Sequence, residues 1–337
     1  MAPTLFDKIW NKHVVCNNAG FPDILYIDVH LINKVTSAKA FEGLRKRNIG
    51  VLRPSQTLIS KDATHEKHVS VSDLSLFQHE LFKKNCSDFG LEIFEQNFVD
   101  QTDILNVLPG QILVFDQHQR NDMGAFGVLS ICINDSLVEQ VLATQCLLIH
   151  KPKRMKVEIN GKLAIGLTAK DINHFLISKV SAAGVNRYFI EYSGDIILNL
   201  NMEERIMICN MSREIGAMGG LIAPDEITLE YMCKHDMMPL KESEVENYSS
   251  WQNLYSDESS VFDEVFEFDA EDIGPGNYGI DLSKLMRSQP ADEALEIITH
   301  DGAAILAGYN DTDYLLNNLE SIEAFESSKI YKPADEA

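Results

Sequence analysis

The segment Ile208-Cys-Asn-Met-Ser-Arg-Glu-Ile-Gly-Ala-Met-Gly-Gly-Leu-Ile-Ala-Pro-Asp-Glu226 decides how the rest of the chain is interpreted. Around its start and within it, apolar residues recur at helical spacing, at Ile206, Met207, Met211, Ile215 and Met218. Gly219-Gly220 and Pro224 then interrupt the pattern. Together these features predict a buried helix over residues 203–218.

Two polar residues of this helix share one of its faces. Asn210 and Glu214 are four residues apart, so an amide and a carboxylate lie one turn from each other. Two interpretations remain open for this face. It is either the polar wall of a site or a solvated stripe opposite the apolar residues.

The composition is that of a globular protein with a strong negative charge. Hydrophobic residues make up 45% of the 337, enough for a sizeable core. The 29 Lys and Arg are outnumbered by 51 Asp and Glu, which gives a formal net charge of −22. Nucleic acids and membranes are therefore not expected partners, because both need clustered cations. Without a signal sequence or an apolar run of about 20 residues, we expect a cytoplasmic protein.

Strand and helix signals alternate from the N-terminus onward. Residues 4–13 form a predicted amphipathic helix, residues 24–30 a strand that presents Asp28 and His30 near its end, and residues 37–46 a second helix. This order predicts an α/β fold.

Local signals predict further elements downstream. Ser136-x-x-Glu139 and Thr168-x-x-Asp171 are predicted capping boxes, and Asn160-Gly161 is a hairpin signal between residues 156–159 and 162–165. Residues 261–269 are acidic and alternate like a half-exposed edge strand. A last unit is predicted as a strand at 303–307, a turn at 308–312 and a helix at 313–325.

The stretch Leu25-Tyr-Ile-Asp-Val-His-Leu-Ile-Asn-Lys-Val-Thr-Ser-Ala-Lys-Ala-Phe-Glu-Gly-Leu-Arg45 resembles the opening of the large subunit of 3-isopropylmalate dehydratase, in the aconitase superfamily. The similarity resumes in Gly124-Ala-Phe-Gly127, in residues 138–145 and 166–172, and from Cys209 to Thr228. It covers roughly residues 4–270 in the same order.

The resemblance implies an aconitase-like, multi-domain α/β fold with α/β/α layers. It places domain 1 at residues 1–182, domain 2 with the acidic segment at 183–295, and a remnant of the cluster-bearing third domain at 296–337. We therefore expect the third domain to be truncated.

Members of this family dehydrate and rehydrate a hydroxy acid on a 4Fe-4S cluster held by three thiolates. The resemblance places one ligand in the turn at 308–312, which reads Gly-Tyr-Asn-Asp-Thr, and the other two beyond Ala337. The six cysteines of the chain stand singly, without a C-x-x-C pair. We therefore expect no iron–sulfur cluster, no other cofactor and no metal site.

Other polar residues match positions that the resemblance implies lie near the active site, although each is also compatible with packing or capping. His118 lies near the place of a family histidine that has no counterpart here. The candidate acids and bases of a cluster-free reaction are Asp28, His30, Asp62, His118 and Glu214. The candidate substrate-binding residues are Arg53, Asn210 and Arg120, with Arg213 as a further carboxylate ligand.

Three functions remain open. The first is a repurposed, lyase-like enzyme of specialised metabolism that binds or transforms a small hydroxy-carboxylate. The second is a non-catalytic subunit that binds a small-subunit-like protein. The third, a genuine 3-isopropylmalate hydro-lyase, is disfavoured by the missing cluster ligands. The substrate is not named by the sequence.

Overall fold

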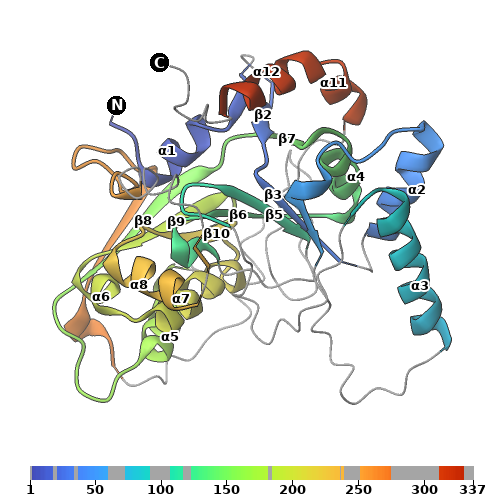
Figure 1. Ribbon diagram of the computed structural model, residues 1–337. Coiled ribbons are helices and arrows are strands. Elements are labelled where there is room, and N and C mark those ends of the chain that lie inside the picture. Colours follow the sequence, from blue (N-terminus) through green and yellow to red (C-terminus); the bar gives the residue numbers. More distant parts are fainter. Residues whose placement is uncertain are drawn as a thin grey trace.

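The computed structural model describes residues 2–17, 21–33, 37–59, 73–91, 107–116, 123–180, 184–235, 237–238, 251–274 and 311–329. Within these ranges the strands form two parallel four-stranded sheets and one antiparallel three-stranded sheet, with helices packed around them (Figure 1). The predicted α/β class is confirmed. No helix in these ranges is long and apolar enough to cross a membrane.

The first parallel sheet has the order β4-β3-β5-β6. Its strands are β3 (Val29–Ile32), β4 (Thr57–Ile59), β5 (Ile112–Asp116) and β6 (Leu129–Ile133). On one face, α2 (Ser37–Arg47) and α4 (Asp135–Thr144) bury apolar residues against β5 and β6. α3 (Asp73–Asp88) packs against α2. The other face contributes to a second apolar cluster with the short helix η2 (Met123–Phe126).

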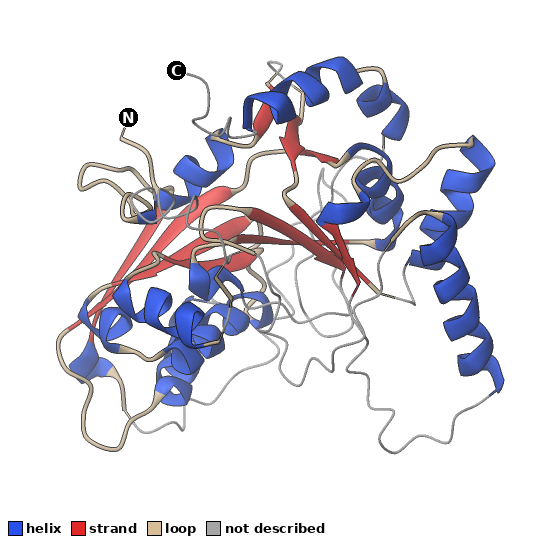
Figure 2. Ribbon diagram, in the orientation of Figure 1, coloured by secondary structure: helices blue, strands red, loops and turns tan. Residues whose placement is uncertain are grey.

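The second parallel sheet has the order β10-β9-β8-β11. Its strands are β8 (Lys153–Asn160), β9 (Tyr188–Ser193), β10 (Gly219–Ile222) and the edge strand β11 (Glu264–Asp269). Four helices gather on one side of it, as Figure 2 shows: α5 (Ala169–Val180), α6 (Asp195–Asn199), α7 (Met202–Glu214) and α8 (Glu226–Lys234). On the opposite face, Phe6 of α1 (Leu5–Asn11) packs against Phe189 of β9.

The antiparallel sheet joins residues far apart in the sequence. It consists of β1 (Val14–Cys16), β2 (Asp23–Tyr26) and β7 (Cys146–Ile149). The helices α11 (Thr312–Leu316) and α12 (Leu319–Lys329) cover it through Leu315 and Ile322. Short helices η1 (Pro54–Gln56) and η5 (Ala270–Asp272) complete the described elements.

Several local predictions are confirmed. The helices expected at 4–13 and 37–46 are α1 and α2. Half of the capping box expected at Thr168 and Asp171 forms, because the Thr168 backbone N–H and hydroxyl donate to Asp171 Oδ2 at 2.9 and 3.0 Å. The acidic edge strand expected at 261–269 is β11, whose residues are exposed or half-exposed.

Other local predictions were wrong. The single strand expected at 24–30 is two strands, β2 and β3, in different sheets. The hairpin expected at Asn160-Gly161 does not form, because β8 pairs in parallel with β9 and β11 instead. α4 begins after Asn134, so Ser136 lies inside the helix and is not its cap.

Two helix ends also differ from expectation. The helix predicted over 203–218 ends at Glu214, because Gly216 has a φ of +93° and Gly219-Gly220 already pair with β9. The helix predicted over 313–325 is interrupted between α11 and α12. The strand expected at 303–307 lies outside the described residues. The domain boundary expected at 182/183 falls between β8 and β9, neighbours in one sheet, and the domain division stays a prediction.

Candidate functional site

The first parallel sheet offers a natural place for a ligand at the edge where its four strands end, here called the carboxyl edge. Ligands of open α/β sheets bind at this edge, where the strand order reverses. In β4-β3-β5-β6 the reversal lies between β3 and β5. The chain that follows β4 contains Asp62, and the chain that follows β5 contains His118 and Arg120. These three candidates lie outside the described residues.

The C-terminal turn of α7 lies against the carboxyl edge. The Arg213 guanidinium is 5.0 Å from the centroid of the Phe115 ring, and its Nη2 donates to Cys132 Sγ at 3.3 Å. Phe115 and Cys132 are paired in register and are the penultimate residues of β5 and β6. A cation stacked on an aromatic face is held in orientation as well as in place. Arg213 therefore fixes this turn at the ends of the two strands.

Asn210 and Glu214 lie on the less buried side of the same turn. The buried residues of α7 are Met202, Arg205, Ile208, Cys209 and Ser212. Asn210 is half-buried and Glu214 is exposed. The two residues share a face as expected, and that face is open to solvent at Glu214. Their roles in a site stay a prediction.

Three glycines let the surrounding elements approach α7 closely. A Cβ on Gly124 of η2 would lie 2.0 Å from the Gly220 carbonyl oxygen of β10. A Cβ on Gly220 would lie 2.3 Å from Ser212 Oγ of α7, and one on Gly127 would lie 2.7 Å from Pro224. These glycines come from Gly124-Ala-Phe-Gly127 and from the opening segment. Two of the segments that carry the family resemblance therefore form one packed unit.

Asp28 lies at the opposite end of the sheet. Its Oδ2 accepts from the backbone N–H of Ile112, the first residue of β5, at 2.8 Å and lies 2.6 Å from His13 Nε2. His13 Nδ1 is 2.7 Å from the Ile9 carbonyl, which can only accept. Asp28 thus ties the end of α1 to the start of β5, away from the carboxyl edge.

His30 is fully buried within β3. Its backbone pairs with Thr57 and Val114, and neither ring nitrogen has a hydrogen-bond partner among the described residues. Burial lowers the pKa of His30 to about 3, so the ring is neutral. Without contact to solvent, His30 has the surroundings of a core residue.

Arg53 is engaged by a carboxylate of the chain itself. Its Nε donates to Glu326 Oε1 at 2.6 Å, and its Nη2 binds Glu326 Oε2, which makes a two-pronged ion pair with α12. The Tyr26 hydroxyl donates to the same carboxylate at 3.2 Å. Arg53 precedes β4, so it too lies away from the carboxyl edge.

The sequence analysis missed Phe115 and Cys132 as neighbours of Arg213. The contact between Cys132 and Arg213 joins residues 81 apart in the chain, and neither strand residue belongs to a recognisable motif. Only the pairing of β5 with β6 and the docking of α7 bring them together.

The cysteines of this sequence do not fit a cluster held by three thiolates. All six lie within the described residues as free thiols. Cys132 and Cys209 belong to one apolar cluster, Cys86 to a second and Cys146 to a third. No three His, Cys, Asp or Glu side chains of the described residues are grouped to hold a metal ion. The cofactor content of the protein stays a prediction.

Comparison with known proteins identifies the family. The model of the aconitase family (aconitate hydratase) matches residues 7–279. The 3-isopropylmalate dehydratase large subunit of Cytophaga hutchinsonii is 42% identical over 94% of this chain and 72% of its own length. That of Bacteroides thetaiotaomicron is 40% identical over 81% of this chain and 61% of its own length.

Among solved structures, the crystal structure of Thermococcus kodakaraensis aconitase X in its holo-form matches with a TM-score of 0.40 and 9% identity. The match covers 74% of this chain and 58% of that one. The family assignment depends on the family model and the curated relatives, whose matches span most of the chain. On this evidence the chain belongs to the aconitase family.

Proposed function

We propose that the chain binds a small hydroxy-carboxylate at the carboxyl edge and removes or adds water there. The observation that supports this most directly is the position of the α7 turn, where Arg213 is oriented by Phe115 and Cys132 beside Asn210 and Glu214. A guanidinium matches the geometry of a carboxylate. In the proposed mechanism Arg213 binds the substrate carboxylate and Asn210 a hydroxyl group.

The proposed acid–base chemistry uses carboxylate and imidazole groups, which can accept and donate protons. Glu214 would take the proton from the carbon next to the substrate carboxylate, and a second group would protonate the departing hydroxyl. His118 and Asp62 are the proposed partners, since they follow β5 and β4 in the chain. We propose that no iron–sulfur cluster takes part, because the thiols of this sequence do not converge.

A second function is favoured by the names of the relatives, which are large subunits. In this alternative the chain binds a small-subunit-like protein and depends on it for activity or supports it without catalysis. Co-purification with such a partner, with turnover only in the complex, would favour assisted catalysis. A complex that forms without any turnover would favour the non-catalytic subunit.

The proposed site is tested by thermal shift with malate-type and citrate-type acids. A ligand at about 100 times its Kd stabilises the folded state by about 2.7 kcal/mol. We expect Arg213→Met to lose the shift, and Glu214→Gln to keep the shift while losing turnover. Glu203→Gln, an exposed change in the first turn of α7, is the matched control and should retain both.

Two outcomes would contradict the proposal. Absence of a shift with every hydroxy acid would exclude the binding site. Iron–sulfur absorbance in anaerobically purified protein, with dehydratase activity that depends on it, would instead support a genuine hydro-lyase.

A further inference from the structure

A buried carboxyl group lies outside the candidate site, in the middle of the second parallel sheet. Glu191 belongs to the central strand β9, pairs in register with Leu221 and Lys156, and is only 6% exposed. Alternation along the strand puts its side chain on the face of Phe189, which packs against Phe6 of α1 with ring centroids 5.3 Å apart. Glu191 therefore lies on the α1 face of the sheet.

One hydroxyl group connects Glu191 to two other segments. The Ser256 hydroxyl donates to Glu191 Oε2 at 2.8 Å, and Ser256 Oγ accepts from the backbone N–H of Leu5 at 2.7 Å. Because an amide N–H can only donate, the Ser256 hydroxyl proton is directed at Glu191. This chain of two hydrogen bonds links β9, the segment 251–260 and the first residue of α1.

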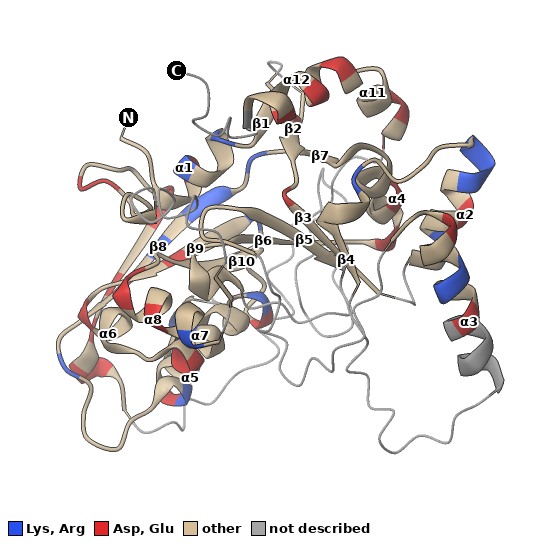
Figure 3. Cartoon of the chain, in the orientation of Figure 1, with Lys and Arg blue, Asp and Glu red and all other residues tan. Residues whose placement is uncertain are grey.

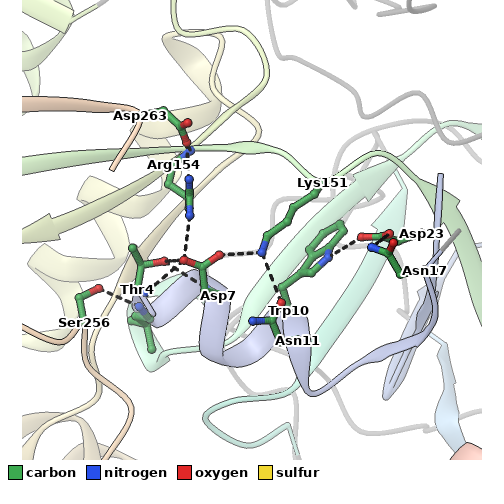
Figure 4. A network of polar contacts seen from close by, with 11 residues as sticks. Thr4, Asp7, Trp10, Asn11, Asn17, Asp23, Lys151, Arg154, Ser256 and Asp263 are labelled. Carbon is green, nitrogen blue, oxygen red and sulfur yellow. Dashed lines mark hydrogen bonds and ion pairs between the residues drawn. The ribbon is translucent and has the colours of Figure 1, made fainter. Parts of the chain in front are cut away.

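Ion pairs hold α1 in place near this link (Figure 4). Asp7 of α1 lies 2.7 Å from Lys151 and 3.0 Å from Arg154, and Arg154 is also 3.0 Å from Asp263. Lys8 pairs with Asp257 at 2.6 Å. In Figure 3, Lys and Arg positions are seen in blue near α1 and β8. α1 and the segment 251–260 are therefore held by ion pairs, in which Asp7 is itself buried, and by the buried carboxyl group of Glu191.

The charges around Glu191 come from few elements. The pKa of Glu191 is raised to about 7, chiefly by burial; Ser256, Lys156 and the Leu5 amide lower it, and Asp7 of α1 adds to the rise. β10 contributes no charged side chain, since its residues are Gly219–Ile222. Lys156 is itself paired with Glu158. A charge on Glu191 is thus poorly compensated within the sheet.

We propose that Glu191 is a proton-controlled latch that docks α1 and the segment 251–260 on the second sheet when neutral and loosens both when ionised. An ionised carboxylate is unfavourable while it is buried. Ionisation of Glu191 therefore favours local opening of α1 and the segment 251–260, because opening allows water to reach the carboxylate. The latch does not depend on the proposed function, since none of its residues belongs to the carboxyl edge.

Hydrogen exchange of the full chain tests the latch. Protection factors, corrected for the intrinsic exchange rate, are measured by mass spectrometry for peptides covering residues 2–11 and 251–260 at pH 6 and pH 8. When the segments open, the Glu191 carboxyl group regains an ordinary pKa and ionises more readily than in the closed state. Opening is therefore favoured as the pH rises, and we expect protection to fall about tenfold from pH 6 to pH 8. In Glu191→Gln the corrected protection should be the same at both pH values.

One control variant and two contradicting outcomes make the test decisive. Glu258→Gln removes an exposed carboxyl group from the same segment and should retain the wild-type tenfold change. If wild-type protection of the two segments does not change between pH 6 and pH 8, the latch is excluded, whatever the variants do. It is equally excluded if Glu191→Gln keeps the tenfold change.

Discussion

His30 and Glu191 are two buried titratable side chains that act on stability in opposite directions. Burial lowers the pKa of His30 to about 3 and raises that of Glu191 to about 7. In the unfolded chain His30 binds a proton below about pH 6.5, which favours unfolding as the pH falls. Unfolded Glu191 loses its proton above about pH 4.5, which favours unfolding as the pH rises toward 7. Each contribution is therefore seen best by replacing one residue at a time.

Replacement of His30 by an apolar residue should remove one component of acid sensitivity. Between pH 7.5 and 5.5 the depressed pKa of His30 costs about 1.4 kcal/mol of folding free energy. We expect urea unfolding at pH 7.5 and pH 5.5 to give the free energy of unfolding of His30→Leu relative to wild type. This relative stability should be higher at pH 5.5 than at pH 7.5 by about the same amount. A difference that stays the same at both pH values would contradict the assignment of a neutral, buried ring.

The sequence predicts the position of some candidate side chains but not of others. Asn210 and Glu214 could be placed on one face because helical spacing is local. Asp28 and Arg53 could not be assigned, because their partners His13, Ile112 and Glu326 come from other elements. The orientation of Arg213 on Phe115 likewise depends on how a helix and a sheet pack.

At the scale of elements, η2 and β10 approach each other so closely that no side chain fits between them at Gly124. A Cβ on Gly124 would meet the Gly220 carbonyl, which belongs to a paired strand and cannot move freely. Overpacking of this kind costs about 3 kcal/mol. We expect Gly124→Ala to lower the free energy of unfolding by about that amount in urea titration.

The matched control for Gly124→Ala is Gly50→Ala. Gly50 is exposed, and a Cβ there would meet nothing within 4 Å. This substitution should change stability by less than about 0.5 kcal/mol. Equal stability of the two variants would show that η2 and β10 are not in close contact.

Element prediction succeeded where the signal was local and failed where a distant strand decided the outcome. Thr168 and Asp171 lie three residues apart, and the expected hydrogen bond from the Thr168 N–H to the Asp171 carboxylate forms. Asn160-Gly161 carries an equally clear turn signal, yet no hairpin forms there, because β8 pairs in parallel with β9 and β11. The apolar run at 24–30 is divided because Asp28 accepts from Ile112, 84 residues away.

At the scale of the whole molecule, the helices α11 and α12 return to elements near the N-terminus. Leu315 and Ile322 pack on the antiparallel sheet, and Arg47 of α2 pairs with Asp313 at 2.7 Å. Asp and Glu positions occur along both helices (Figure 3). The Arg53–Glu326 pair joins residues 273 apart and is therefore a long-range link of the fold.

Arg53 was predicted from sequence to bind substrate, and its contact with Glu326 allows that role to be separated from a structural one. Arg53→Met and Glu326→Gln should each lower the free energy of unfolding by about 1 kcal/mol, and the double variant should lose little more than either alone, because both break the same ion pair. Urea unfolding of the four proteins gives the coupling between the two side chains. For a structural Arg53, the thermal shift produced by hydroxy acids stays as in wild type. Loss of that thermal shift in Arg53→Met but not in Glu326→Gln would instead support the prediction that Arg53 binds substrate.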